Sequence, residues 1–344
     1  MSIKRKLGIL TAFMLLFCAC VSEEDSYTQG VWERKSDFDG SARGYACSFN
    51  IGSYGYVFGG STGKKSLRDL WVYDTENNYW KQCASLPEEG TERHDAVAFS
   101  VNGKGYITTG VVHSTGKYLN DTWEYNPDTD TWRRMDDFPG TPRYGALSFS
   151  IGGYGYVGAG KDEDNYLKDI YRFNPEAPSG SQWEIVNGYG GSKRLYATTF
   201  VIDDVAYICC GENNNSNVND FWKFDGFSWT QLRDISNTND EEEYDDDYAI
   251  IRSRAVSFII DGQAYLVGGN SGGNGTVHSD YWVYNPDTDL WSGDTEDDFT
   301  PFEGSSRTGM VAISTGKRGF IVTGTSGSYT FDDVWELLPY KLQD

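Results

Sequence analysis

The sequence is poor in proline, histidine and basic residues. It contains 9 Pro and 3 His, and its 29 Lys and Arg against 51 Asp and Glu give a net charge of −22 at pH 7. The electrostatic field of a protein with this charge repels phosphates, so we expect neither nucleic acid nor an anionic membrane surface as a partner. With only His94, His113 and His278 available, we expect no metal and no cofactor. The 40 Gly and the scarcity of helix-forming runs predict strands joined by turns.

The N-terminus has the features of a signal peptide. Lys4, Arg5 and Lys6 precede an apolar run, Leu7 to Phe17, that is too short to span a bilayer. The run ends in Phe17-Cys18-Ala19-Cys20, which resembles a bacterial lipobox with Cys20 as the lipidated residue. We therefore expect a signal peptide at 1–19, an acidic tether at 20–30 and a lipid anchor in the outer membrane. The acidic run 22–25 suits cell-surface export or an ordinary tether equally well.

The remaining cysteines do not predict a disulfide framework. Cys47 and Cys83 stand where other repeats carry apolar residues, and Cys209 and Cys210 are adjacent within a predicted strand. Adjacent cysteines rarely form a relaxed disulfide. We interpret all four as small packing residues.

Six internal repeats dominate the chain. Each opens with R-x-x-[A/M]-x-x-[F/I], has an aromatic residue 13 positions after the Arg and a Gly 17 positions after it, and then carries Asp-x-Trp or Asp-x-Tyr. The opening arginines are Arg43, Arg93, Arg143, Arg194, Arg252 and Arg307. Four predicted strands per repeat, separated by Gly, Asn-Pro and Asp turn signals, indicate an all-β fold.

The two ends of the array complete one repeat. Five repeats close on a Trp, the sixth lacks one, and Trp32 precedes Arg43 by the 11 residues that separate Trp132 from Arg143. Residues 31–37 therefore supply the missing last strand of the last unit. An array closed in this way forms a ring without open sheet edges.

The repeat motifs resemble kelch repeats, in R-x-x-A, the Gly after the second strand, Asp-x-Trp and the closing Trp. The resemblance covers residues 31–337 and implies a six-bladed β-propeller. We expect one domain, 31–344, with blades starting near residues 43, 93, 143, 194, 252 and 307, and a monomeric protein. Several repeats carry one Gly where kelch repeats usually have Gly-Gly.

The string Gly153-Tyr-Gly155-Tyr-Val-Gly158 matches the G-x-G-x-x-G pattern of phosphate-binding loops. In the sister repeats the third position is Phe58, Thr108, Cys209, Val267 or Val322, and no helix follows. We interpret the match as a hairpin turn followed by small residues of a strand.

The loops between second and third strands and between blades are long and varied, and they share one face of the ring. Variable loops on a rigid scaffold favour recognition, so we expect the ligand site there, at the mouth of the central channel. The six opening arginines would ring this mouth and offer forked donors to an acidic ligand, as this position does in some kelch proteins. The alternative is that each pairs with a carbonyl or an acid of its neighbouring blade. The expected site comprises Arg43, Tyr45, Arg93, His94, Arg143, Tyr144, Arg194, Tyr196, Arg252, Arg254 and Arg307.

These features favour a binding or scaffolding propeller over an enzyme. The expected ligand is a glycan, an acidic small molecule or a partner protein of the cell envelope. The resemblance also admits a carbohydrate-active enzyme, similar to the kelch sialic-acid epimerase or to the copper-radical oxidase of galactose, but no catalytic residue is identified. The acidic run 240–247 lacks the spacing of a calcium loop, and we expect a solvated loop there.

Overall fold

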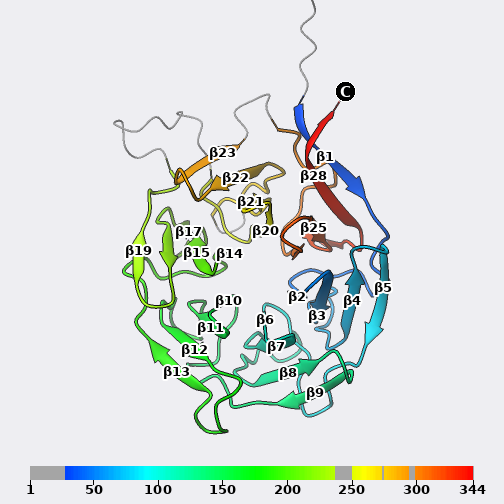
Figure 1. The fold of residues 1–344 in the computed structure, drawn as a ribbon. Coiled ribbons are helices and arrows are strands. Elements are labelled where there is room, and N and C mark those ends of the chain that lie inside the picture. Colours follow the sequence, from blue (N-terminus) through cyan, green and yellow to red (C-terminus); the bar gives the residue numbers. More distant parts are fainter. Residues whose placement is uncertain (1–27, 237–249, 273–274, 294–298, 344) are drawn as a thin grey trace, which may run out of the picture.

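The fold is a six-bladed β-propeller, as expected (Figure 1). The computed structural model describes residues 28–236, 250–272, 275–293 and 299–343, and all regular structure in these ranges is β. No helix among these residues is long and apolar enough to cross a membrane. Each blade is a four-stranded antiparallel sheet whose first strand lines the channel.

The strands follow one order in blades one to five. The first three blades are β2 (Cys47–Ile51), β3 (Tyr54–Phe58), β4 (Leu70–Asp74) and β5 (Tyr79–Cys83); β6 (Val97–Val101), β7 (Lys104–Thr108), β8 (Thr122–Asn126) and β9 (Thr131–Arg134); and β10 (Leu147–Ile151), β11 (Tyr154–Gly158), β12 (Ile170–Phe173) and β13 (Trp183–Val186). The next two are β14 (Thr198–Ile202), β15 (Val205–Cys209), β18 (Trp222–Phe224) and β19 (Trp229–Gln231); and β20 (Val256–Ile260), β21 (Gln263–Val267), β22 (Tyr281–Asn285) and β23 (Leu290–Gly293). Short hairpins extend two of the long loops: β16 (Glu212–Asn213) with β17 (Ser216–Asn217), and β26 (Thr325–Ser326) with β27 (Tyr329–Thr330).

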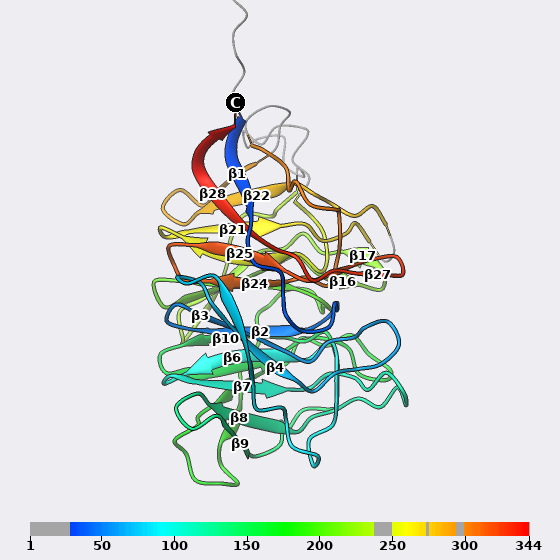
Figure 2. The same cartoon turned by 90° about the vertical axis from the view of Figure 1, so that its right-hand side faces the viewer.

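The sixth blade joins the two ends of the chain. It consists of β24 (Val311–Ser314), β25 (Gly319–Val322), β28 (Val334–Gln343) and β1 (Thr28–Arg34). β1 pairs antiparallel with β28, with Trp32 opposite Leu337, and the two strands run side by side in Figure 2. The closing strand thus begins at Thr28, inside the range 20–30 expected to be tether, and it ends at Arg34.

A buried ion pair joins the strands within every blade. The opening Arg donates to the Asp that precedes the third strand: Arg43 Nη1 and Nη2 lie 2.7 and 2.8 Å from the two carboxylate oxygens of Asp69. Nη1 also donates to the backbone oxygen of Gly59, after the second strand. The Trp71 indole donates to the same carboxylate, at 2.8 Å. One guanidinium therefore connects the start of the first strand to the second and third strands.

Contacts between blades repeat in the same regular way. In blades one to four the indole of the closing Trp donates to a backbone oxygen of the preceding blade's segment, as Trp132 does to Ala84 at 2.7 Å and Trp229 to Asn187 at 2.7 Å. Along the channel, the Ser148 hydroxyl donates to the backbone oxygen of Ala98 at 2.9 Å. Hydroxyls at the equivalent positions of three other blades make the same bond. Four of the six blades are therefore hydrogen-bonded to a neighbour in this way at the rim, and four at the axis.

The glycines of the G-x-G-x-x-G string have packing roles. Gly153 takes the left-handed conformation in the β10–β11 turn, with φ of 78°. A Cβ on Gly155 would lie 2.1 Å from the Phe99 ring of the preceding blade, and one on Gly158 would lie 2.1 Å from the backbone oxygen of Asp169. The string is therefore part of the scaffold, as the sister repeats indicated.

We expect Asp121→Ala to destabilise the protein by about 3–5 kcal/mol, because it leaves the fully buried Arg93 without its counter-charge. Asp37→Ala is the control: it breaks the pair of Asp37 with Arg34, whose side chains are 52% and 56% exposed, and should cost less than about 1 kcal/mol. Urea unfolding of both variants measures the difference. Equal losses would show that the buried pair does not hold the blade together.

The residue after each second strand adopts a left-handed conformation even where it is not Gly. Thr109 has φ of 63°, is fully buried, and its hydroxyl has no hydrogen-bond partner within the described ranges. Glycine occupies this position in two other blades, as Gly59 and Gly268. Repeats with a single Gly thus keep the same backbone as the repeats with Gly-Gly, at the cost of a strained residue.

Thr109→Gly should therefore raise the free energy of unfolding by about 1 kcal/mol, since it removes both the strained left-handed Thr and an unsatisfied buried hydroxyl. Thr108→Gly is the matched control, because Thr108 is extended in β7 and its hydroxyl accepts a hydrogen bond from Thr122. That variant should be destabilised. A loss of stability in both variants, measured by thermal unfolding, would refute the strain at Thr109.

Candidate functional site

The six opening arginines do not face the channel mouth, which corrects the expected site. Each is at most 2% exposed, and each bonds an acid and a carbonyl of its own blade rather than of a neighbour. The reason is the ion pair with the Asp before the third strand, which holds the guanidinium inside the blade. The residues concerned are Arg43, Arg93, Arg143, Arg194, Arg252 and Arg307.

The mouth is formed instead by the residues two positions after these arginines, which we call the mouth ring: Tyr45, Asp95, Gly145, Tyr196, Arg254 and Gly309. All six have left-handed backbones, with φ between 52° and 62°. Backbone hydrogen bonds connect them in sequence around the axis, from Tyr45 N to Gly309 O at 2.8 Å through to Arg254 N to Tyr196 O at 3.2 Å. Four non-Gly residues in this conformation represent strain, which proteins tend to keep at functional sites.

Behind the mouth ring the channel contains empty space. A chamber of about 130 Å³ lies directly beneath the ring, and its walls include Ala46, Ala96 and Ala146. These alanines also line the main channel cavity of about 450 Å³ between the first strands. The chamber and the channel cavity therefore share the layer of alanines that follows the mouth ring.

Asp95 is the most unusual group of the mouth ring. Its side chain is only 10% exposed, and its carboxylate lies 3.6 Å from His94 Nε2. Burial raises the pKa of Asp95 to about 7, although Arg254 and the Tyr196 hydroxyl favour the ionised form. A carboxyl with such a pKa in a concave site is a functional candidate.

Arg254 is the one basic residue of the mouth ring. Its guanidinium lies 4.0 Å from the centre of the Tyr196 ring and 3.7 Å from the carboxylate of Glu212, which is 4% exposed. Tyr196 in turn contacts Tyr144 edge-on, and Tyr144 lies against Tyr118 with ring centres 5.0 Å apart. An aromatic wall therefore leads from the β7–β8 loop to Arg254.

The sequence analysis placed His94 at the channel mouth, but its side chain turns away from the channel. Its Nδ1 is 2.9 Å from the Ser66 hydroxyl, and its ring lies 6.0 Å from that of His113. Burial, with a contribution from His113, lowers the pKa of His94 to about 4, so its contact with Asp95 is not an ion pair at neutral pH. The third histidine, His278, is bonded to Ser271 in the fifth blade.

No group of three or more metal-ligating residues occurs among the described residues. The free cysteines there are Cys47, Cys83, Cys209 and Cys210, and none of them lines the chamber below the mouth ring. The Cys20 anchor and the acidic run 240–247 lie outside the described residues.

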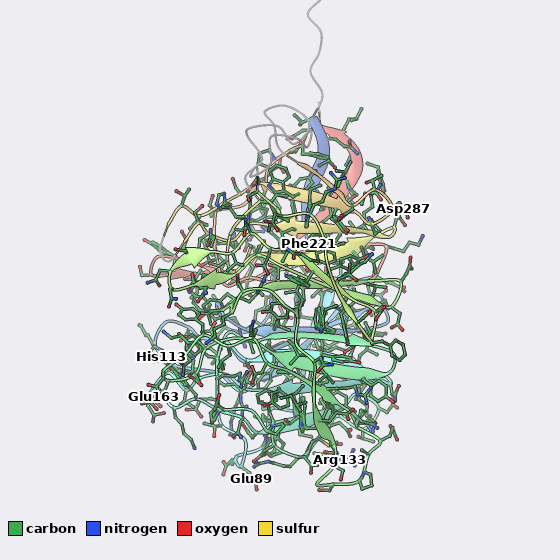
Figure 3. All side chains as sticks on the ribbon, turned by 90° about the vertical axis from the view of Figure 1, so that its left-hand side faces the viewer. Glu89, His113, Arg133, Glu163, Phe221 and Asp287 are labelled. Atoms are coloured by element: carbon green, nitrogen blue, oxygen red, sulfur yellow. The ribbon has the colours of Figure 1, made fainter. Side chains whose placement is uncertain are left out.

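Of the expected site, the structure brings Tyr45, Tyr196 and Arg254 together, with Tyr144 beside them. Asp95, Glu212 and Tyr118 were missed. Asp95 stands where two other repeats have Gly, which is the signal that could have identified it. Figure 3 shows His113 and Glu163, from two of the long loops, on one face and Asp287, from a tight β22–β23 turn, on the opposite face.

The raised pKa of Asp95 predicts a pH-dependent stability difference. The folded protein holds the Asp95 proton more tightly than the unfolded chain, so its stabilising contribution is complete below about pH 4 and is lost as pH rises to about 7. Asp95→Asn should therefore match wild type near pH 4 and become more stable than wild type by up to about 4 kcal/mol at pH 8. Denaturant unfolding at four pH values measures this. Glu163→Gln should show no such trend, and a pH-independent difference for Asp95→Asn would contradict the assignment.

Comparisons with known proteins match two parts of the chain. Residues 28–141 match the family model of the KLHDC2/KLHL20/DRC7 Kelch-repeats domain, and residues 251–293 match that of the Kelch motif. Kelch domain-containing protein 3 of Homo sapiens is 30% identical over 95 residues, which is 25% of this chain and 25% of that protein. Kelch-like protein 23 of Pongo abelii is 31% identical over 93 residues, or 27% of this chain and 15% of that protein. The matched region is thus a quarter or less of these relatives.

A solved structure, "Structure of YjhT", is similar over 90% of this chain and 99% of its own, with a TM-score of 0.69 and 15% sequence identity. At that identity the likeness concerns the fold alone. Together with the repeat matches, it supports the placement of this chain among the kelch-repeat proteins, as a six-bladed propeller.

Proposed function

We propose that this protein is a binding module of the bacterial cell envelope, held at the outer membrane by a lipid on Cys20 and exposing its long-loop face to a ligand. The observation that supports it best is the mouth ring, in which strained residues place a buried carboxyl over an internal chamber. The chamber of about 130 Å³ is too small for a whole sugar or peptide, since a cavity of about 150 Å³ takes one benzene molecule. The ligand is therefore a larger partner, a protein or a glycan, that inserts one protruding group.

The aromatic wall offers the contact surface for the rest of such a ligand. Tyr118 and Tyr144 stand partly exposed beside the mouth ring, and tyrosines provide large, rigid contact areas at interfaces. The long loops carrying residues 111–119 and 161–167 adjoin this wall, since Tyr118 belongs to the first and Lys161 of the second pairs with Tyr144. Recognition thus combines an inserted group with contacts along one side of the mouth.

A second candidate is an enzyme acting on a carbohydrate, favoured by one observation. A carboxyl with a pKa near 7 is matched to general acid–base catalysis at neutral pH. Turnover of a bound sugar, abolished in Asp95→Asn, would distinguish this candidate from binding alone.

To test the binding function, the photo-crosslinking residue benzoylphenylalanine is placed at Tyr144, beside the mouth ring, in cells that produce the protein. The same substitution at Tyr54, the first residue of β3, which is 43% exposed beside the β2–β3 turn of the opposite face, is the matched control. Discrete crosslinked products from position 144 and none from position 54 are expected. Products of equal yield from both positions would refute a ligand site at the mouth.

A further inference from the structure

The charges at the mouth do not balance. Arg254 is the one cation of the mouth ring, and it acts on two carboxylates: it lies 3.7 Å from Glu212, which is 4% exposed, and it favours the ionised form of Asp95. The opening arginines are each matched by an Asp of their own blade and add no net charge. Asp95 is nine-tenths buried, and within the described ranges its carboxylate has no ion pair with Lys or Arg. Above about pH 7, where Asp95 is ionised, two carboxylates therefore share one Arg at the mouth, which leaves one negative charge in excess among the described residues.

The chamber below Asp95 has the size of a short alkyl chain with a small polar head. Its volume of about 130 Å³ corresponds to about five non-hydrogen atoms, on the scale at which about 150 Å³ takes the six of benzene. Five alanines, Val256 and Met310 give the chamber an apolar part that suits methylene groups, and the mouth ring forms the rest of the wall. The end of a lysine side chain, four methylenes and a nitrogen, is of this size.

The walls and the long-range field also favour a cation. Arg254 lies 4.0 Å over the Tyr196 ring, which shows that the aromatic faces here accept positive charge, and Tyr45 supplies another ring to the mouth. The loop between β11 and β12 places Asp162, Glu163 and Asp164 on the same face. With a net charge of −22 over the whole protein, this surface steers cations toward the channel and repels acids.

Resting on the proposed function, we propose that the group inserted into the mouth is an aliphatic ammonium, which binds the Asp95 carboxylate while its methylenes fill the alanine-lined chamber. The ligand is therefore basic, in contrast to the acidic small molecule that the arginine pattern of the sequence suggested. A lysine side chain of an envelope protein and a free alkylamine share this chemistry.

Three probes of nearly equal size and different charge test the proposal: n-butylammonium, n-butanol and n-butyrate. Binding is followed by calorimetry at pH 8 on wild type, Asp95→Asn and Glu163→Gln. We expect butylammonium to bind at least about tenfold more tightly than butanol, and butyrate not to bind. Asp95→Asn should lose this preference, whereas Glu163→Gln removes the same charge outside the chamber and should keep it. Thermal unfolding confirms that both variants are folded.

A second pair of ligands distinguishes the two sources of the ammonium: cadaverine, and a peptide with an acetylated N-terminus and one unmodified lysine. Loss of affinity in Tyr118→Ala for the peptide alone indicates a protein ligand, because only a peptide reaches the aromatic wall. If Tyr118→Ala binds both ligands as tightly as wild type does, the ligand is a free amine.

Three other outcomes would overturn the inference, and the first two of them leave the proposed function intact. Tighter binding of butyrate, abolished by Arg254→Gln, would show that the mouth recognises an acid. Absence of binding by all three probes, with crosslinks still formed at position 144, would show that the ligand inserts a different group. Absence of both binding and crosslinks would reject the proposed function as well.

Discussion

One buried ion pair per blade determines where everything else in this propeller lies. The opening Arg is drawn into its blade by the Asp before the third strand, and the chain must then reverse within two residues to begin the first strand. That reversal is the left-handed residue of the mouth ring. Burial of the carboxyl opposes its ionisation, but the hydrogen bonds from Arg43 and Trp71 outweigh burial and lower the pKa of Asp69. The charge pair thus stays intact at neutral pH and holds the mouth in a fixed geometry.

In each repeat the residue that stabilises the blade and the residue proposed to bind the ligand lie two positions apart. The Arg is identical in all six blades because the ion pair is needed six times, whereas the position two residues later holds Tyr, Asp, Gly or Arg. A rigid ring with interchangeable side chains can acquire a ligand without any change of fold. The alanines below the ring keep the chamber open, since larger side chains would fill it.

The sequence predicts the fold nearly completely and the site only in part. The spacing of Arg, Gly, Asp-x-Trp and closing Trp gives the six blades and their closure, because each of these residues has one structural role in every blade. The same regularity led to the wrong interpretation of the arginines, since spacing says where a residue begins a strand but not in which direction its side chain turns. The sequence did not identify Asp95 because its raised pKa comes from burial, against which Arg254 from a distant repeat acts only in part. The start of β1 at Thr28 was also missed, because its first residues pair with the end of β28 and carry no repeat motif.

The closure of the ring has a consequence for how the protein is made. Thr28 pairs with Gln343, so the first strand of the described chain finds its partner only when almost the whole chain is present. Until then five blades can assemble along the chain, while the edge that β1 must cover stays open to other strands. Contacts between such distant segments form slowly. Because synthesis proceeds from the N-terminus, the segment that forms β1 must remain unpaired until β28 is made, and a holding chaperone would be most valuable at this strand.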